Sequence, residues 1–507
     1  MHLRRVAVWL LLALSGCSGG SSLPTIVPDL SRRSQPPTLQ MQGAQGPLTA
    51  AQSRAVLERL ASRGPATDIF ERHLALEEAI VGSPLTVGNR VLLLPDGPAT
   101  YRAMFAAIAA ATDHINLETY ILEDDEIGRR FAQALIDKQG QGVQVNLIHD
   151  SAGSFGTPKA FFQRLVDSGV RVLEYNPVNP LLARREWELN QRDHRKLLVV
   201  DGRTAFVGGI NISSVYSGGS ASRGKGVQRE GGPGWRDTDL QIDGPAVAEF
   251  QKLFLATWEG QKGPPLAPRA YFPKPQNAGR LVVRAIGSSP DEAYSLIYAT
   301  LLSAIGSAET SVHLTNAYFV PDPQLLAALQ AAAARGVDVT LILPGQTDSW
   351  LVFHAGRGHY EPLLRAGVKI VERRGAILHS KTALVDGVWA TVGSTNLDWR
   401  SFLHNRELNA VVLGAEFGAQ LQAMFAHDLA DSDPVLLADW EHRSPLLRAK
   451  EWLAGLWAYW LRETRPMVWG ASCAPANRRH AVAAPKMAGG SFPARAKPPG
   501  SSRTRKH

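Results

Sequence analysis

The stretch from His194 to Asn211 reads HRKLLVVDGRTAFVGGIN, and a closely similar stretch from His379 to Asn396 reads HSKTALVDGVWATVGSTN. The His, Lys, Asp and Asn of the first copy all recur 185 positions later in the chain. Most of the apolar positions between them differ. A duplication that keeps the polar residues while the apolar ones change indicates chemistry more than packing.

Each copy predicts a β-hairpin, because an apolar run leads into Asp-Gly and then into a second apolar run that ends in glycine. With the first turn centred on residues 202–203, His194 faces Asn211. Side chains alternate along a strand, so Lys196 shares a face with His194. We therefore expect an imidazole, an ammonium and a carboxamide on one surface. The second copy gives the corresponding set His379, Lys381 and Asn396.

These residue types favour phosphodiester chemistry at a site shared by two half-sites. Histidine titrates near neutrality, so one copy can supply a nucleophile and the other a general acid. Lysine and amide donors stabilise the non-bridging oxygens of a phosphoryl group. No H-E-x-x-H or C-x-x-C pattern occurs, and the carboxylates of both copies fall at the turns. We therefore expect a reaction without a metal or another cofactor.

Both copies resemble the HxKxxxxD motif of the phospholipase D superfamily, including the Gly-x-Asn that follows it. The resemblance covers roughly residues 84–430 and is closest to bacterial cardiolipin synthases. It implies a covalent phosphohistidine intermediate. It also implies that the motif residues are catalytic, namely His194, Lys196, Asp201, His379, Lys381 and Asp386.

The same resemblance implies a set of supporting residues. Asn211, Asn396 and Ser394 belong to the trailing part of each motif. In the family an acidic residue beyond the hairpin orients a catalytic histidine, and this role carries over to Glu407 and Asp237. The match is looser at Asp237, where an ordinary surface strand remains an alternative. Three further histidines have no counterpart in the duplication and are predicted to be structural: His354, His359 and His404.

Strand and helix patterns alternate through both halves of the chain, which predicts an α/β fold. The resemblance implies two similar domains, each a mixed sheet flanked by helices, related by a pseudo-two-fold axis with the active site at their interface. The first spans 51–262, with a helical segment at 51–82 packed on it. A linker at 263–280 leads to the second domain at 281–432.

The N-terminus predicts membrane attachment. Residues 1–17 combine a basic start, a short apolar run and Leu-Ser-Gly-Cys, which resembles the lipobox of bacterial lipoproteins. This implies acylation of Cys17 and a periplasm-facing lipoprotein on the inner or outer membrane. An uncleaved anchor or an ordinary secretory signal are the alternatives. Residues 18–50 are rich in Ser, Pro, Gly and Gln and are predicted to form a flexible tether.

The formal net charge of +8 resides in the C-terminal tail, because residues 471–507 carry eight Lys and Arg side chains and no acidic one. The body is therefore close to neutral, which disfavours nucleic acid as a partner. Residues 433–470 predict an amphipathic helix with a tryptophan stripe suited to a membrane interface or to docking on the core. The tail is expected to be disordered and to attract anionic headgroups.

The sequence and the resemblance together predict a phosphatidyltransferase that acts on phospholipids. His194 is assigned as nucleophile and His379 as acid, but the pseudo-symmetry of the two copies leaves the reverse assignment open. By resemblance, the preferred reaction is cardiolipin synthesis from phosphatidylglycerol. Three alternatives stay open: a phospholipase D that uses water, a nuclease, and a lipid-binding module without activity. The sequence names no protein partner. Two loops, 149–154 and 213–234, are candidates for lining or gating the site.

Overall fold

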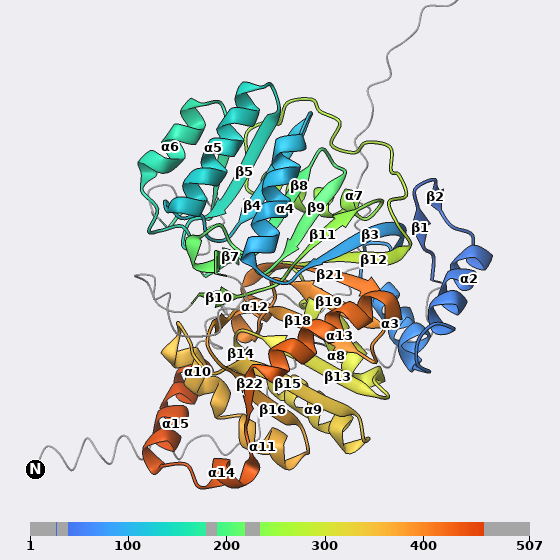
Figure 1. The fold of residues 1–507 in the computed structure, drawn as a ribbon, viewed down its shortest axis with the longest axis vertical. Coiled ribbons are helices and arrows are strands. Elements are labelled where there is room, and N and C mark those ends of the chain that lie inside the picture. Colours follow the sequence, from blue (N-terminus) through green and yellow to red (C-terminus); the bar gives the residue numbers. More distant parts are fainter. Residues whose placement is uncertain (1–26, 28–38, 179–189, 219–233, 461–507) are drawn as a thin grey trace, which may run out of the picture. The chain divides into compact units, whose positions relative to one another are not determined.

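The computed structural model describes residue 27 and residues 39–178, 190–218 and 234–460. Cys17, most of the predicted tether, most of the loop 213–234 and the tail lie outside these residues. Strands and helices alternate through two similar halves, and helices flank a mixed sheet (Figure 1). The predicted α/β fold with two repeated halves is therefore confirmed.

Among the described residues, the main sheet of the first half has seven strands, and four helices accompany it. Its strands are β3 (Thr86–Leu94), β4 (His114–Thr119), β5 (Gln144–Asp150), β6 (Arg171–Tyr175), β8 (Leu197–Val200), β9 (Thr204–Gly208) and β11 (Asp239–Asp243). Its helices are α4 (Gly97–Ala110), α5 (Glu126–Gly140), α6 (Lys159–Asp167) and α7 (Val247–Gly260).

The second half repeats this order. Its strands are β12 (Leu281–Ser288), β13 (Ser311–Asn316), β15 (Asp338–Pro344), β16 (Lys369–Arg373), β18 (Lys381–Val385), β19 (Trp389–Gly393) and β21 (Asn405–Leu413). Its helices are α8 (Leu296–Ser307), α9 (Pro323–Ala334), α10 (Trp350–Arg357), α11 (Tyr360–Arg365) and α13 (Ala415–Ala430), and the short α12 (Trp399–Leu403) precedes β21.

Strand pairing has the same pattern in both halves. In the first, β6, β5 and β4 are parallel, and β8, β9, β11 and β3 continue the sheet in antiparallel fashion. The second half pairs β16, β15, β13, β18, β19, β21 and β12 in the matching order. Antiparallel pairing of β3 with β12 joins the two sets at the centre. The hairpin β8–β9 and its copy β18–β19 thus occupy equivalent places.

Local sequence explains where the helices begin. α4 starts after Asp96, whose side chain accepts a hydrogen bond from the backbone N–H of Ala99 at 2.9 Å. α9 starts after Asp322, which accepts from Leu325 N–H at 3.0 Å in the same way. Both helices have proline in the first turn, where a missing N–H costs nothing.

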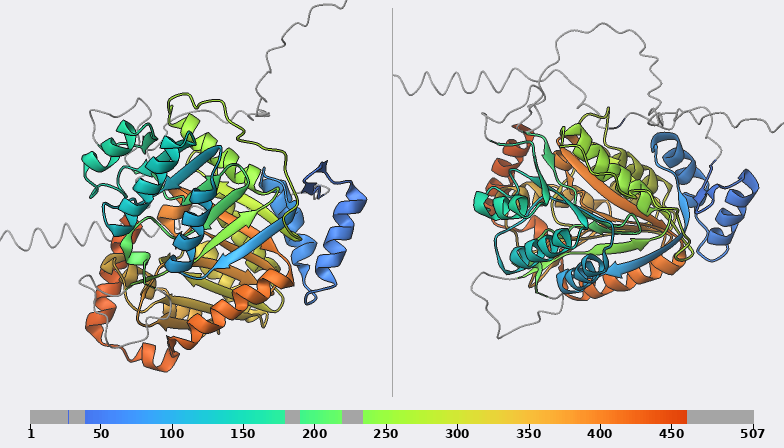
Figure 2. Two further views of the ribbon diagram at one scale, coloured as in Figure 1. Left: turned by 45° about the horizontal axis from the view of Figure 1, so that its top comes forward. Right: turned by 90° about the horizontal axis from the view of Figure 1, so that it is seen from above.

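The two halves share a hydrophobic core. Phe250, Phe254 and Trp258 of α7 are buried in one cluster with Phe417 and Leu421 of α13. The same cluster contains apolar residues of both hairpins, so each hairpin has one face in this shared core. The positions of the two motifs are thereby coupled through packing. Figure 2 shows the ribbon from two further sides.

Both predicted hairpins form, but their register is one residue away from the prediction. Val200 pairs with Thr204, so the first turn has three residues instead of two. Asp201 and Gly202 both adopt a left-handed conformation, with φ of 54° and 61°. The second hairpin has the same geometry, because Val385 pairs with Trp389.

The predicted facing of His194 with Asn211, and of His379 with Asn396, is therefore wrong. The strand pairing of the first hairpin ends at Leu197 and Val207, before it reaches the histidine. Beyond that point the segment before β8 and the segment after β9 no longer pair with each other.

The N-terminal segment packs on the second half, so the predicted packing on the first is wrong. Residues 51–82 form α2 (Ala50–Ala61), a short turn of helix and α3 (Arg72–Ile80). Glu77 of α3 forms an ion pair with Arg284 at 3.0 Å and accepts a hydrogen bond from the indole of Trp389 at 3.3 Å. Both partners lie in the second half.

The predicted tether is also too long at its C-terminal end. Residues 39–49 contain strands β1 (Gln42–Gly43) and β2 (Gly46–Pro47), and β1 pairs with β3. Met41 is fully buried in the core of the second half. The apolar side chains of Met41 and Leu48 explain this ordering, because the segment can bury them.

After β22 (Ser432–Pro434) come α14 (Leu437–Glu441) and α15 (Pro445–Trp460), which falls within the predicted helical region. α15 packs on α10 through the buried Ala454. Trp452 and Leu453 stay exposed on its other side. Of the helices in the described residues, none has the length and apolar character to cross a membrane.

Candidate active site

Two short parallel strand pairings connect the two halves. β7 (Arg192–Asp193) pairs with the first two residues of β21, Asn405 and Arg406. β10 (Trp235–Arg236) pairs with β17 (Ile377–Leu378). The residue after each bridge is a predicted site residue. This register sets His194 beside Glu407 and His379 beside Asp237.

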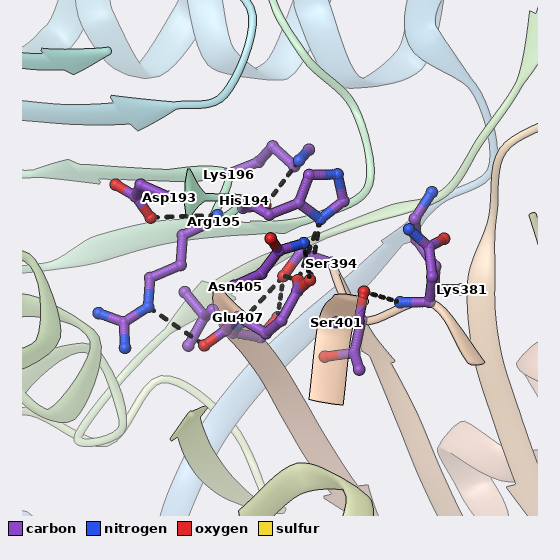
Figure 3. Close-up of polar contacts among 12 residues, drawn as sticks. Asp193, His194, Arg195, Lys196, Lys381, Ser394, Ser401, Asn405 and Glu407 are labelled. Atoms are coloured by element: carbon purple, nitrogen blue, oxygen red, sulfur yellow. Dashed lines mark hydrogen bonds and ion pairs between the residues drawn. The ribbon is translucent and has the colours of Figure 1, made fainter. Parts of the chain in front are cut away.

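Each motif histidine is therefore paired with a carboxylate from the opposite half. His194 Nδ1 lies 3.1 Å from both carboxylate oxygens of Glu407 (Figure 3). His379 Nδ1 lies 2.6 Å from Asp237 Oδ2. A carboxylate on Nδ1 fixes the tautomer and the ring orientation. Nε2 is then the nitrogen of each ring that can reach a phosphorus atom.

The two motif lysines are buried beside the rings. Lys196 Nζ donates to the His194 carbonyl at 2.6 Å, and Lys381 Nζ donates to the His379 carbonyl. Burial lowers the pKa of Lys196 to about 7 and that of Lys381 to about 8. A bound anion would offset this cost, because opposite charge favours the ammonium form. Lys196 and Lys381 can therefore bind an anionic group, such as a phosphodiester, beside the histidines.

Burial favours the neutral form of both rings when no anion is bound. Burial lowers the pKa of His194 to about 4, with Glu407 opposing and Lys196 adding to the shift. The pKa of His379 is lowered well below its usual value by burial and then by the charges of Lys381 and Lys196. A neutral imidazole has the lone pair that a nucleophile needs.

The two carboxylates differ in their surroundings. Burial would raise the pKa of Glu407, but the His194 ring, Lys196 and the Ser394 hydroxyl outweigh it and lower the pKa. Ser394 Oγ donates to Glu407 Oε2 at 2.5 Å, and Asn405 Nδ2 donates to Glu407 Oε1 at 3.2 Å. Burial raises the pKa of Asp237 to about 6, although Lys381 opposes the shift. Glu407 is therefore the more firmly ionised member.

Glycine explains part of this difference. The first copy has Gly209 where the second has Ser394. A Cβ on Gly209 would lie 2.3 Å from Asp237 Oδ1, so the shorter carboxylate fills the space that a side chain would need. The supporting role predicted for Ser394 thus belongs to the second copy alone.

The two motif asparagines take different positions from those predicted. Asn211 Nδ2 donates to the Tyr216 hydroxyl at 2.9 Å, and this hydroxyl lies 3.4 Å from His379 Nδ1. Asn211 therefore reaches the histidine of the second copy and not His194. Asn396 is buried, and its Oδ1 has no hydrogen-bond partner among the residues that the structure describes.

The motif aspartates do not belong to the site, which corrects their prediction as catalytic residues. Asp201 accepts hydrogen bonds from the backbone N–H groups of Thr112, Asp113 and His114 at 2.9 Å each. Asp386 accepts from Glu309, Thr310 and Ser311 in the same way. Each aspartate lies at the turn end of its hairpin, and an entire strand separates it from the lysine. Their function is to fix the hairpin on the neighbouring strand.

Aromatic residues around the rings were not predicted. The Tyr120 ring lies 5.1 Å from His194, and the Tyr318 ring lies 6.2 Å from His379. Trp235 also contacts His379, at 4.9 Å between ring centres. Tyr120 follows β4 and Tyr318 follows β13, which are equivalent strands. Tyr120 is one residue past the end of β4, and Tyr318 is two residues past the end of β13. The two tyrosines are therefore a duplicated feature that one extra residue after β13 hides in the sequence.

The remaining sequence candidates lie outside the pair. His354 packs against Trp350 on α10, His359 precedes α11, and the His404 carbonyl accepts from the N–H of Arg192. Asp150 of the loop 149–154 accepts from the backbone N–H of Asp193 at 2.9 Å, next to His194. Across residue 27, 39–178, 190–218 and 234–460, no group of three or more His, Cys, Asp or Glu side chains could hold a metal ion.

The buried cations predict a pH profile. As pH rises through about 7 to 8, Lys196 and Lys381 lose their protons in the free enzyme. The positive charge that binds an anionic substrate is then lost. As pH falls toward about 4, His194 gains a proton and loses its nucleophilic lone pair. We expect kcat/KM for a soluble phosphodiester to be highest between these limits. Lys196→Gln should remove the part of the alkaline decline near pH 7, and an unchanged profile would contradict this assignment.

Comparisons with known proteins agree with this geometry. The family model described as "Cardiolipin synthase, PLD-like domain" matches residues 104–216 and 301–429, one match in each half. The protein named cardiolipin synthase from Geobacillus sp. (strain WCH70) is 36% identical over 382 residues, which are 75% of this chain and 74% of that protein. The cardiolipin synthase of Halalkalibacterium halodurans is 34% identical over 74% of this chain and 73% of its own.

A solved structure supports the fold. The phosphatidylserine synthase of Haemophilus influenzae superposes with a TM-score of 0.54 at 13% identity, over 77% of this chain and 98% of that one. With two motif copies in the two halves, two cross-half histidine–carboxylate pairs and relatives of this similarity, the chain belongs to the cardiolipin synthase family of phospholipase D-like proteins.

Proposed function

We propose that this protein is a phosphatidyltransferase that makes cardiolipin and glycerol from two molecules of phosphatidylglycerol. The observation that carries the proposal is the pair of buried histidines, each held by a carboxylate of the other half, next to two buried lysines. This arrangement can hold one phosphodiester and pass it through a covalent intermediate. The relatives named cardiolipin synthase support cardiolipin as the product.

In the first step, His194 Nε2 attacks the phosphorus of one phosphatidylglycerol. The bond from phosphorus to the glycerol headgroup breaks, and the leaving oxygen takes the Nε2 proton of His379, a ring that carries this proton once the phosphodiester anion is bound. In the second step, the free hydroxyl of another phosphatidylglycerol gives its proton to His379 and attacks the same phosphorus. The N–P bond breaks, and cardiolipin forms. Lys196 and Lys381 hold the non-bridging oxygens throughout.

The assignment of His194 as nucleophile rests on its partner. A phosphorylated imidazole carries positive charge for as long as the intermediate lasts, and an ionised carboxylate stabilises it. Glu407 is the carboxylate with the lowered pKa. Burial raises the pKa of Asp237 to about 6, so this carboxylate is the less firmly ionised one, and the proton transfers are assigned to the ring beside it.

Product analysis distinguishes the alternatives. Water is present at roughly 55 M, so an alcohol competes only when it is bound in place, where effective molarity can reach about 10⁵ M. We expect vesicles of labelled phosphatidylglycerol to yield cardiolipin and glycerol in equal amounts. Phosphatidic acid as the main product, with acceptor lipid abundant, would make the enzyme a hydrolase. Cleavage of an oligonucleotide without either lipid product would make it a nuclease.

We also propose that the chain is a membrane-anchored lipoprotein, acylated at Cys17 and facing the periplasm. The lipobox-like Leu-Ser-Gly-Cys and a phospholipid substrate support this. We expect Cys17 to incorporate a labelled fatty acid in a bacterial host and the Cys17→Ser variant to incorporate none. A protein that incorporates no label in either form would contradict the proposal.

A further inference from the structure

Two loops occupy equivalent places on either side of the histidine pair. One follows β5 and leads into α6, and the other follows β15 and leads into α10. The first contacts Tyr120, because Ser154 Oγ lies 3.3 Å from the Tyr120 carbonyl. The second contacts Tyr318, whose hydroxyl donates to Asp348 at 2.7 Å. These are the two tyrosines whose rings lie on His194 and His379, so each loop adjoins one half of the active site.

A large aromatic side chain is exposed to solvent within the first loop and directly after the second. Phe155 is 77% exposed, five residues after the end of β5. Trp350 is 50% exposed, six residues after the end of β15. A single exposed aromatic residue is ordinary on a soluble protein. Two at equivalent positions beside one site indicate a surface that has a partner.

α15 extends this surface on the side of the second half. It packs on α10, which begins with Trp350, and it exposes Trp452, Leu453 and Leu456. Figures 1 and 2 place α6, which follows the Phe155 loop, and α15 on the same side of the described chain in every view. The exposed face of α15 therefore belongs to an element that packs beside the Trp350 end of α10, next to the loop that adjoins Tyr318.

The charges of this surface match anionic lipid. Lys159 follows Phe155 at the start of α6, and α15 carries Arg448 and Lys450. The one acidic residue on the exposed side of the Trp350 loop, Asp348, is bonded to Tyr318. Exposed tryptophan and phenylalanine flanked by cations suit the headgroup level of a bilayer.

We propose that Phe155, Trp350 and the exposed face of α15 insert into the interfacial layer of an anionic phospholipid bilayer and hold the active site over it. The proposal rests on the proposed function, since the phosphodiester of a bilayer lipid must reach a buried histidine pair. Two anchor points, one from each half, fix the orientation of the site as well as its distance from the membrane. A protein partner would need fewer cations on the rim and is the competing outcome of the test.

The test reads insertion at single positions. In the full chain with both native cysteines changed (Cys17→Ser, Cys473→Ser), a polarity-sensitive dye is attached to Phe155→Cys or to Phe272→Cys. Phe272 is the matched control, because it is 52% exposed and lies beside the hairpin turn at Gly202, at the other end of β8 from Lys196. With vesicles of phosphatidylcholine and phosphatidylglycerol, we expect a blue shift from position 155 and none from position 272.

A second measurement compares variants. The double variant Phe155→Ser with Trp350→Ser should need at least about tenfold more lipid for half-maximal vesicle binding, and Phe272→Ser less than about twofold. Its turnover of vesicle phosphatidylglycerol should fall by a similar factor relative to turnover of bis(p-nitrophenyl) phosphate in solution. Equal dye shifts at both positions, or unaltered vesicle binding by the double variant, would overturn the proposal and assign the aromatics to a protein partner. If insertion is seen but phosphatidylglycerol is not converted, the surface stands and the proposed function fails.

Discussion

Replacing either catalytic histidine, as His194→Ala or His379→Ala, is expected to lower phosphatidyl transfer by at least about 10³-fold. The two rings act in sequence on one phosphorus atom, so neither step proceeds at a useful rate when one ring is missing. For the same reason, the double variant should be at most a few-fold slower than the slower of the two single variants. Initial rates of cardiolipin formation in vesicles measure this.

His354→Ala is a suitable control, because His354 lies on α10 against Trp350 and has no counterpart in the duplication. It should reduce soluble-substrate turnover by no more than about threefold. Thermal unfolding of each variant excludes a loss of fold as the cause. Near-wild-type activity in both histidine variants would remove the basis of the mechanism.

The cross-half carboxylates give the second large effect. Glu407→Gln and Asp237→Asn are each expected to lower kcat by about 10²- to 10⁴-fold, with a smaller change in KM. The amide keeps the shape of the site but removes the charge that stabilises a cationic ring and fixes its tautomer, and such losses reach about 10⁴-fold in hydrolases of the serine type. Turnover of a soluble phosphodiester measures both parameters.

A double-mutant cycle tests the pairing itself. His194 and Glu407 come from different halves, yet their Nδ1 and carboxylate oxygens lie 3.1 Å apart. Adding Glu407→Gln to His194→Ala should therefore cost little more, since the interaction is already gone. Adding Glu407→Gln to Asn211→Ala should cost nearly the full single-variant effect. Equal costs in both backgrounds would show that Glu407 does not act through His194.

The duplication predicted which side chains form the site, because their identity and offset can be read directly from the chain. It did not predict how they pair. The bridges that set His194 beside Glu407 are two residues long, which is too short to leave a periodic signal. The resemblance supplied Glu407 and Asp237 as candidates, and only the three-dimensional fold brings each to the histidine of the other half.

The errors have local physical causes. Asp-Gly predicts a two-residue turn, but Asp201 accepts three backbone hydrogen bonds from residues 112–114, and this holds a three-residue turn in place. The packing of α3 on the second half depends on the ion pair between Glu77 and Arg284, which are 207 residues apart. Amphipathic spacing predicts that a helix packs, and does not predict against which sheet.

Trapping of the covalent intermediate tests the central claim most directly. A phosphatidyl ester with a p-nitrophenol leaving group needs no acid catalysis, so His379→Ala should still release one equivalent of p-nitrophenol in a burst and then stall. Mass spectrometry after quenching in base, where phosphohistidine survives, should find the phosphatidyl group on His194. His194→Ala should give neither burst nor label. A label on His379 in the wild-type chain would reverse the two roles, and steady turnover by His194→Ala without any labelled histidine would contradict the account.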